Sequence, residues 1–178
     1  MNDLIKPTVG EYTGFNSAYV SGVLHEDFLG LYLSQIDDVK EIYGQLGEEK
    51  SNLAYAPGKW TGKEVLGHII DTDRILGYRA LCIARGEKVS LPGFDQDQYM
   101  EGANFNRLPL SQLIRDFELS RLSLDSMAKT FDPASYAVIG AANGFPVSLR
   151  ALLCIIPGHA LHHFKILRER YLTLPDKP

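Results

Sequence analysis

Three of the five histidines lie within the five residues 159–163. They follow an apolar run and lead into residues 164–171, which have the composition and spacing of a helix. On a helix, positions i and i+4 lie on the same face, so His159 and His163 would present two imidazoles to one point. Two neutral imidazoles in this arrangement suit Zn²⁺ or a similar divalent metal. Since two ligands rarely hold a metal, the pair predicts a third ligand elsewhere in the chain.

His68 is the best candidate for that third ligand. It lies on the inward stripe of an amphipathic segment, together with Ile69 and Thr72. A single histidine on an apolar face is more often a packed core residue than a ligand. The pair of His159 and His163 favours the ligand interpretation, because bundle cores build metal sites from facing helices.

Several charged residues follow His68 on the same predicted helix. Asp71 is three residues further on, so the two side chains are helix neighbours. Asp71 could orient an imidazole or act as a base near the metal. A surface carboxylate that pairs with Arg74 is the simpler interpretation. We expect Asp73, Arg74 and Arg79 to be helix-face charges or to form ion pairs between helices.

Four long helices would position these residues. Apolar side chains that recur at three- and four-residue steps predict helices over residues 26–45, 61–85, 109–131 and 148–172. Thr61 and Glu64 form a capping-box pattern, and Ser148 is the expected N-cap of the last helix. Gly47 is a plausible stop for the first. Pro157 lies inside the last helix, so we expect a kink immediately before the histidines.

The segments between these helices are long. Residues 1–24 are expected to be an irregular lead-in that packs on the body through Tyr12, Phe15 and Tyr19. Residues 86–108 form a connection long enough to cover a site, in which Asp95 and Asp97 are expected to form turns or, alternatively, to approach a pocket mouth. Residues 132–147 could form a short hairpin, since Asn143-Gly144 suits its turn. The pattern predicts an all-α four-helix bundle with long crossover connections, in one domain over residues 1–178.

The composition is that of an ordinary globular protein. The net charge is −4, from 18 Lys and Arg against 22 Asp and Glu, and the charges are interspersed. We therefore expect neither a nucleic acid nor an anionic membrane as a partner. No secretory signal pattern and no membrane-length apolar run is visible, so a cytoplasmic location is expected. Cys82 and Cys154 lie in apolar helical contexts and are expected to be buried free thiols, with a disulfide or ligand role as the alternative.

Two stretches resemble the DinB-like superfamily. Residues 59–71, which begin Lys-Trp-Thr-Gly-Lys-Glu and contain His68, are similar to that family's second-helix motif. Residues 147–163, which end in Gly-His-Ala-Leu-His-His, are similar to its last helix. The resemblance runs from about residue 26 to 172, with both motifs in the expected order. The superfamily includes metal-dependent hydrolases of the YfiT type and bacillithiol S-transferases.

The resemblance implies a four-helix bundle that binds a divalent metal, often Zn²⁺ or Ni²⁺, through three histidines. Carried over position by position, the ligands are His68, His159 and His163. His162 is out of register with the motif, and we expect it to pack beside the ligands or to support them. His25 matches neither motif and is expected to be structural or exposed. Family analogy also suggests a homodimer.

A metal with three histidine ligands keeps at least one coordination position open, as catalytic zinc sites do. The ion would lower the pKa of a water or of a thiol in that position, so it could support hydrolysis or thiol transfer. Our first hypothesis is an enzyme that transfers a low-molecular-weight thiol to an electrophilic small molecule. A hydrolase that uses metal-bound hydroxide and a non-catalytic metal-binding bundle are the alternatives. Motifs of serine hydrolases, P-loops and dinucleotide-binding folds are missing from the sequence.

Overall fold

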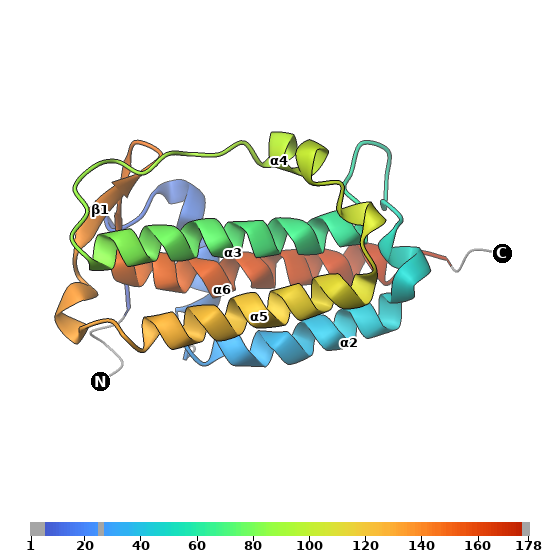
Figure 1. Ribbon diagram of the computed structural model, residues 1–178, viewed down its shortest axis with the longest axis horizontal. Helices are drawn as coiled ribbons and strands as arrows, with labels where there is room; N and C mark the ends of the chain where they lie inside the picture. The colour runs from blue at the N-terminus through green and yellow to red at the C-terminus, as the bar shows by residue number, and fades with distance from the viewer. Residues whose placement is uncertain (1–5, 25–26, 176–178) are drawn as a thin grey trace.

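The computed structural model describes residues 6–24 and 27–175, so His25 lies outside the described residues (Figure 1). In chain order the elements are η1 (Gly14–Asn16), α1 (Ser17–Val23), α2 (Leu31–Ser51), α3 (Gly62–Ala84), α4 (Gln96–Ala103), η2 (Phe105–Arg107), α5 (Leu110–Ala128), η3 (Pro133–Ser135), β1 (Ile139–Ala142), β2 (Phe145–Ser148), α6 (Leu149–Ile166) and η4 (Leu167–Tyr171). No helix among the described residues is long and apolar enough to span a membrane.

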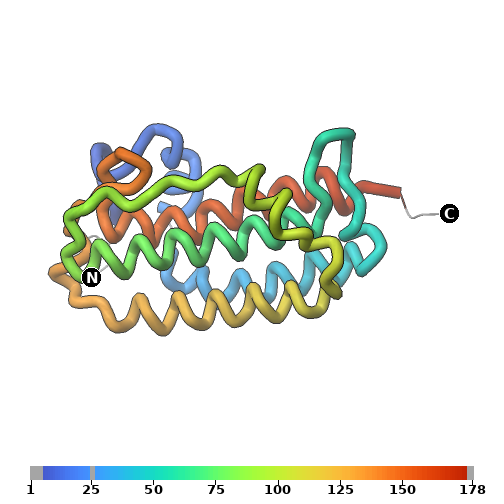
Figure 2. The backbone as a smooth tube through the Cα atoms, turned by 45° about the horizontal axis from the view of Figure 1, so that its top comes forward, coloured from blue at the N-terminus to red at the C-terminus, as the bar shows by residue number. Residues whose placement is uncertain are grey.

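Helices α2, α3, α5 and α6 lie side by side and form the predicted four-helix bundle (Figures 1 and 2). Helices α3 and α5 run in the same direction, so the chain between them must return along the whole length of the bundle. This crossover, residues 85–109, passes over α3 and contains α4 and η2. The long crossover connection expected from the sequence is therefore confirmed.

The cap signals in the sequence form the expected hydrogen bonds. The Thr61 hydroxyl accepts a hydrogen bond from the Glu64 backbone N–H at 3.2 Å, while the Thr61 N–H donates to the Glu64 carboxylate at 2.7 Å. Ser148 caps α6 by accepting from the Ala151 N–H at 3.1 Å. These caps satisfy backbone donors that helix geometry leaves without partners. They start α3 and α6, the helices that carry the histidines.

Helix α6 continues through Pro157 without interruption. Proline has no N–H to donate to the carbonyl four residues earlier, which belongs to Leu153. The Tyr32 hydroxyl of α2 donates to that carbonyl at 2.7 Å and so replaces the missing bond. The Gln35 amide, one turn further along α2, donates to the Pro157 carbonyl at 2.9 Å. The kink that we expect at Pro157 stays a prediction.

The N-terminal lead-in is partly helical, so the expectation of an irregular segment over residues 1–24 was wrong for α1. Val20 and Val23 are fully buried, and α1 packs against α6. A Cβ at Gly158 would lie only 2.1 Å from the Tyr19 carbonyl oxygen, so the glycine permits this close approach. Tertiary packing stabilises a helix of seven residues that would be marginal in isolation. Phe15, which we expected to pack on the body, is 81% exposed.

Other element boundaries differ from those predicted. The first bundle helix spans Leu31–Ser51 rather than 26–45, and it is interrupted at Gly47, whose φ of 66° is not helical. The glycine breaks the helix as expected, but one further turn follows it. Helix α5 ends at Ala128, three residues before the predicted end. Helix α4 was not predicted; Asp95 caps it by accepting from the Asp97 and Gln98 N–H groups.

The predicted hairpin is present and is tied to the crossover. Strands β1 and β2 pair antiparallel around Asn143 and Gly144, whose φ values of 54° and 78° fit the primed turn typical of Asn-Gly. The Leu91 N–H donates to the Ala141 carbonyl at 2.9 Å, and the Asn143 N–H donates to the Leu91 carbonyl at 2.8 Å. These bonds fix the crossover to the hairpin at one end of the bundle.

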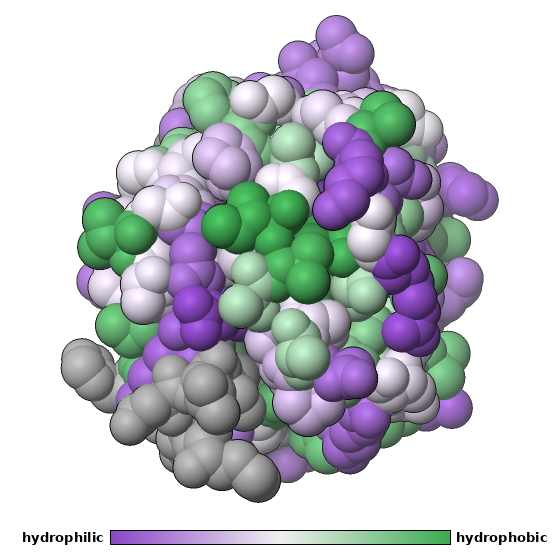
Figure 3. All heavy atoms as spheres, turned by 90° about the vertical axis from the view of Figure 1, so that its left-hand side faces the viewer, coloured by the Kyte–Doolittle hydropathy of each residue, from purple (hydrophilic) through white to green (hydrophobic). Residues whose placement is uncertain are grey.

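That end of the bundle is drawn in Figure 3, where hydrophobic side chains gather near the centre of the face and polar ones surround them. Exposed hydrophobic residues in the elements at this end include Val89 of the crossover and Ile139 of β1. The homodimer suggested by family analogy stays a prediction.

Cys82 and Cys154 are both free, as expected, although only Cys154 is fully buried.

Candidate metal centre

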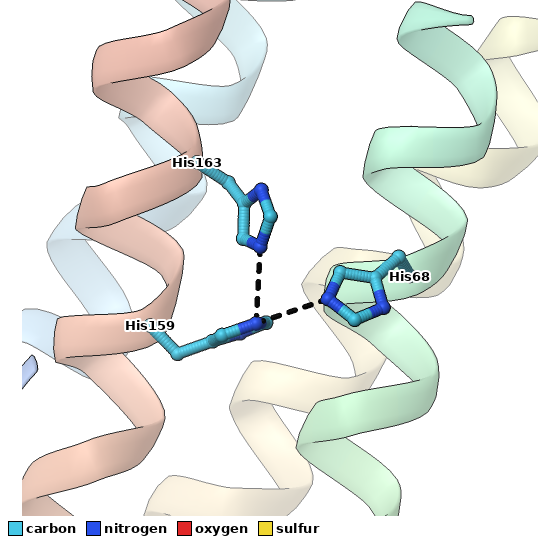
Figure 4. A group of neighbouring side chains, drawn as sticks. All are labelled: His68, His159 and His163. Atoms are coloured by element: carbon cyan, nitrogen blue, oxygen red, sulfur yellow. Dashed lines mark hydrogen bonds between the residues drawn. The ribbon is translucent and has the colours of Figure 1, made fainter. Parts of the chain in front are cut away.

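Three imidazoles meet between α3 and α6 (Figure 4). The Nε2 atom of His159 lies 3.1 Å from the Nε2 atom of His68 and 3.1 Å from that of His163. All three candidate ligand atoms lie within 4.8 Å of one another. A tetrahedral zinc ion with Zn–N bonds of about 2.0 Å separates its ligand nitrogens by roughly 3.3 Å. The observed spacing therefore suits three ligands of one ion.

Hydrogen bonding alone does not account for this arrangement. In a neutral imidazole, each ring nitrogen either carries a proton or offers one lone pair in the ring plane. His159 Nε2 can therefore either donate to one neighbouring Nε2 or accept from one, but it cannot do both. One of its two 3.1 Å contacts stays unsatisfied unless a cation lies between the rings. The donor set thus fits a metal ion.

Burial keeps these imidazoles neutral and available as ligands. His68 and His159 are only 3% and 6% exposed. Desolvation lowers the pKa of His68 to about 4 and that of His163 to about 3. Desolvation also holds the pKa of His159 well below its usual range, with smaller contributions from His163 and His68. All three rings are therefore uncharged near neutral pH, which is the form that binds metals.

Aromatic packing orients two of the rings. The Trp60 ring lies 4.8 Å from the His68 ring, and the Tyr19 ring meets His159 edge-on at 5.4 Å. The Nδ1 atoms of His68 and His159 are buried and have no hydrogen-bond partner in the part of the chain that the structure describes. Ligating histidines commonly donate this N–H to a carboxylate or carbonyl. Here ring contacts hold the orientation instead.

Asp71 lies apart from the three imidazoles. Its carboxylate lies 3.8 Å from the Arg74 guanidinium, and it makes no hydrogen bond to His68. Burial raises the pKa of Asp71, and the neighbouring Arg74 opposes this shift. The pairing with Arg74 agrees with the simpler interpretation of this residue. A role in orienting a ligand or accepting a proton stays a prediction.

His162 is exposed, and its ring lies 5.1 Å from the His163 ring and 5.6 Å from the Tyr19 ring. It does not belong to the group of atoms that could hold a metal ion. This position agrees with packing beside the ligands. His162 is therefore a natural control for the other two histidines of α6.

A cavity of about 410 Å³ opens beside His68 and His159. Its wall combines Tyr19 of α1, Thr72 of α3, Phe94 of the crossover and Asn143 of the hairpin turn, among others. Three segments outside the bundle thus enclose one side of His68 and His159. Among the described residues, no Asp or Glu lines this cavity. A ligand that entered it would contact two of the three imidazoles.

Comparison with known proteins agrees with these features. The family model of the DinB superfamily matches residues 32–167, a span that contains all three histidines. This chain belongs to the DinB superfamily.

The fold of this DinB superfamily member is similar to that of YfiT from Bacillus subtilis, described as a probable metal-dependent hydrolase with an unusual four-helix bundle topology. The TM-score is 0.75 at 15% sequence identity, and the match covers 93% of this chain and 94% of that one. At this identity the likeness concerns the fold alone. No curated protein matches the sequence.

Sequence reasoning missed several residues around the centre of this DinB superfamily bundle. Tyr19 and Asn143 lie in segments without a helical period, so only the folded chain brings them to the cavity. Trp60 was part of the second-helix motif, but the sequence did not predict that its ring contacts His68. Arg79 lies on the same helix face as His68, which was a usable signal. It was expected to be a helix-face charge or to form an ion pair between helices, and the ion pair does not form among the described residues. The pairs expected for Asp73 and Arg74 are confirmed.

Proposed function

We propose that this protein is a metal-dependent enzyme whose ligands are His68, His159 and His163, and that it transfers a low-molecular-weight thiol to an electrophilic small molecule. The observation that carries the proposal is the convergence of three Nε2 atoms beside a cavity of about 410 Å³. Such a cavity supplies an open side for a substrate, which a purely structural metal site does not need. The cavity therefore weighs against a non-catalytic bundle.

A divalent ion such as Zn²⁺ or Ni²⁺ would lower the pKa of a thiol or of a water molecule that reaches it. The chain itself would supply three uncharged ligands to this ion. Burial keeps the three imidazoles neutral, so the ligands would leave the full positive charge of the ion facing the cavity. No carboxylate in the described cavity wall offsets it. This electrostatic setting favours the anionic form of a thiol.

The cavity wall also supports thiol transfer over hydrolysis. Metal-dependent hydrolysis of amides commonly uses a carboxylate as the general base beside the metal. Among the residues described, no Asp or Glu lines the cavity, and Asp71 faces Arg74. A thiol that is ionised by the metal needs no such base, because the thiolate itself is the nucleophile. The hydrolase alternative is supported by the structural likeness to YfiT.

The test is a conjugation assay with metal-loaded protein. Glutathione, cysteine and bacillithiol are each incubated with monochlorobimane, and the fluorescent conjugate is followed with and without a chelator. We expect a metal-dependent rate with at least one thiol, lost in His68→Ala and kept in His162→Ala. Ester or amide hydrolysis without any thiol would instead establish the hydrolase. Bound metal without turnover in either assay would leave a metal-binding bundle.

A further inference from the structure

The cavity follows one face of α3 from the metal ligand to a buried arginine. His68, Thr72, Leu76 and Arg79 all line it, and their spacing places them on one side of the helix. Arg79 follows His68 by eleven positions, which corresponds to roughly 16 Å along the helix axis. The cavity is therefore elongated, with the imidazoles at one end and a guanidinium at the other.

Arg79 is buried without an anionic partner. Arg79 is 8% exposed, and its Nη2–H donates a hydrogen bond to the Pro92 carbonyl at 2.6 Å. No Asp or Glu among residues 6–24 and 27–175 forms an ion pair with it. The other buried arginine, Arg121, lies 2.8 Å from the Asp73 carboxylate. Arg74, on the same helix as Arg79, pairs with Asp116 at 2.6 Å.

A purely structural role accounts for only part of this arrangement. Arg79 contacts the crossover through Pro92 and lies 6.0 Å from the centre of the Phe94 ring, so it helps to hold the crossover against α3. That contact uses one of the five guanidinium N–H groups. It leaves a mostly buried charge without a counter-charge among the described residues. The other guanidinium nitrogens are not among the fully buried atoms without a partner, so they are available to an anion in the cavity. Burial correspondingly lowers the pKa of Arg79.

We propose that Arg79 binds a carboxylate of the substrate, so that the cavity selects elongated, mostly apolar molecules with an acid group remote from the metal end. One guanidinium balances the single charge of a carboxylate and matches its planar geometry. Gln96 and Asn143 add neutral polar groups to the same wall. The inference rests on the proposed function only in taking this cavity as the substrate site.

The probes are octanoate and its uncharged analogue octanamide. Their affinities for the protein are measured by titration calorimetry in the metal-free and zinc-loaded forms. We expect octanoate to bind at least about tenfold more tightly than octanamide in both forms, because hydrogen bonds to charged groups have effects of this size. Binding to the metal-free form cannot come from the octanoate carboxylate binding a metal ion.

Variants assign the preference to Arg79. Arg79→Gln should weaken octanoate binding about tenfold and leave octanamide binding unchanged. Arg79→Lys should keep part of the preference. Arg74→Gln is the matched control, since Arg74 lies outside this cavity and its side chain is 53% exposed. It should bind both probes as the wild type does.

Equal binding of the two probes by the wild type, or no binding of octanoate, would overturn the proposal. So would an Arg79→Gln protein that keeps the preference. If that variant does not fold, the wild-type comparison and Arg79→Lys decide. If the conjugation assay fails while octanoate still binds more tightly than octanamide, the proposed reaction is wrong and the carboxylate site stands. If the enzyme is active but binds the two probes equally, only the carboxylate site is wrong.

Discussion

The proposed chemistry of this protein depends on the register of the histidines in one helix. His159 and His163 lie one turn apart and point toward His68 (Figure 4). His162 is exposed and does not belong to the group of atoms that could hold a metal ion. One residue along a helix rotates a side chain by about 100°, so adjacent histidines cannot share one centre. The i, i+4 spacing was sufficient to predict from sequence which two histidines of α6 come together with His68.

Substitution of the histidines tests the ligand assignment directly. We expect His68→Ala and His159→Ala to lose most of the bound metal, because two imidazoles rarely hold an ion. His162→Ala should keep about as much metal as the wild type. Elemental analysis of the purified variants measures this, and quenching of the single tryptophan, Trp60, by added Ni²⁺ is an independent signal, since its ring lies 4.8 Å from His68. Equal losses in all three variants would contradict the assignment.

At the scale of elements, α1 completes the cavity that the bundle helices leave open. The helix crosses α6 at Gly158, next to His159, and brings the Tyr19 ring against the imidazole. A second contact holds the preceding segment: the Glu11 carboxylate accepts hydrogen bonds from Ser148 and Arg150 at 2.7 Å each. The Arg150 guanidinium lowers the pKa of Glu11 to about 2, so this anchor stays charged even in moderate acid. Both contacts lie on α6 or its N-cap, and α6 is the helix of two candidate ligands.

Gly158→Ala should separate α1 from α6. The new Cβ would lie 2.1 Å from the Tyr19 carbonyl oxygen, a backbone atom that cannot move without its helix. We expect the free energy of unfolding to fall by about 2 kcal/mol, which is typical of overpacking, and the backbone amides of α1 to exchange faster because the helix opens more often. Urea denaturation measures the first effect and amide hydrogen exchange in α1 the second.

Gly44→Ala is the matched control for this substitution. Gly44 lies inside α2, and a Cβ there would meet nothing within 4 Å. We expect this change to stabilise the protein by up to about 1 kcal/mol, as alanine is the better helix former. A Gly158→Ala protein as stable as the Gly44→Ala protein would show that α1 tolerates displacement without cost.

At the scale of the whole molecule, a buried polar layer divides the core into two hydrophobic clusters. Each bundle helix has apolar residues in both clusters, and its buried polar residues in this layer lie near the boundary between them. Its buried members are Gln35, His68, Thr72, Asp73, Arg121 and His159. Asp73 and Arg121 form a fully buried ion pair between α3 and α5 at 2.8 Å. Two of the three histidines of the candidate metal centre, His68 and His159, thus belong to this polar layer.

Asp73→Ala should be strongly destabilising because it leaves the Arg121 guanidinium buried without its counter-charge. Removing one partner of such a pair typically costs about 3 to 5 kcal/mol, whereas replacing both partners with apolar residues is often nearly neutral. We therefore expect the Asp73→Leu, Arg121→Met double variant to be more stable than Asp73→Ala. Chemical denaturation of both proteins measures the difference. A double variant that is no more stable would mean that the layer depends on the charges themselves.

The sequence alone determined the bundle and predicted that three histidines meet inside it, because both follow from local periodicity. Apolar spacing places His68, His159 and His163 on inward helix faces, and the caps at Thr61 and Ser148 depend on residues within three positions. Only the tertiary structure decided the cavity, since its wall comes from α1, the crossover and the hairpin. Tyr19 packs beside His159 because Gly158 lets two distant segments meet, and no local pattern encodes such a contact.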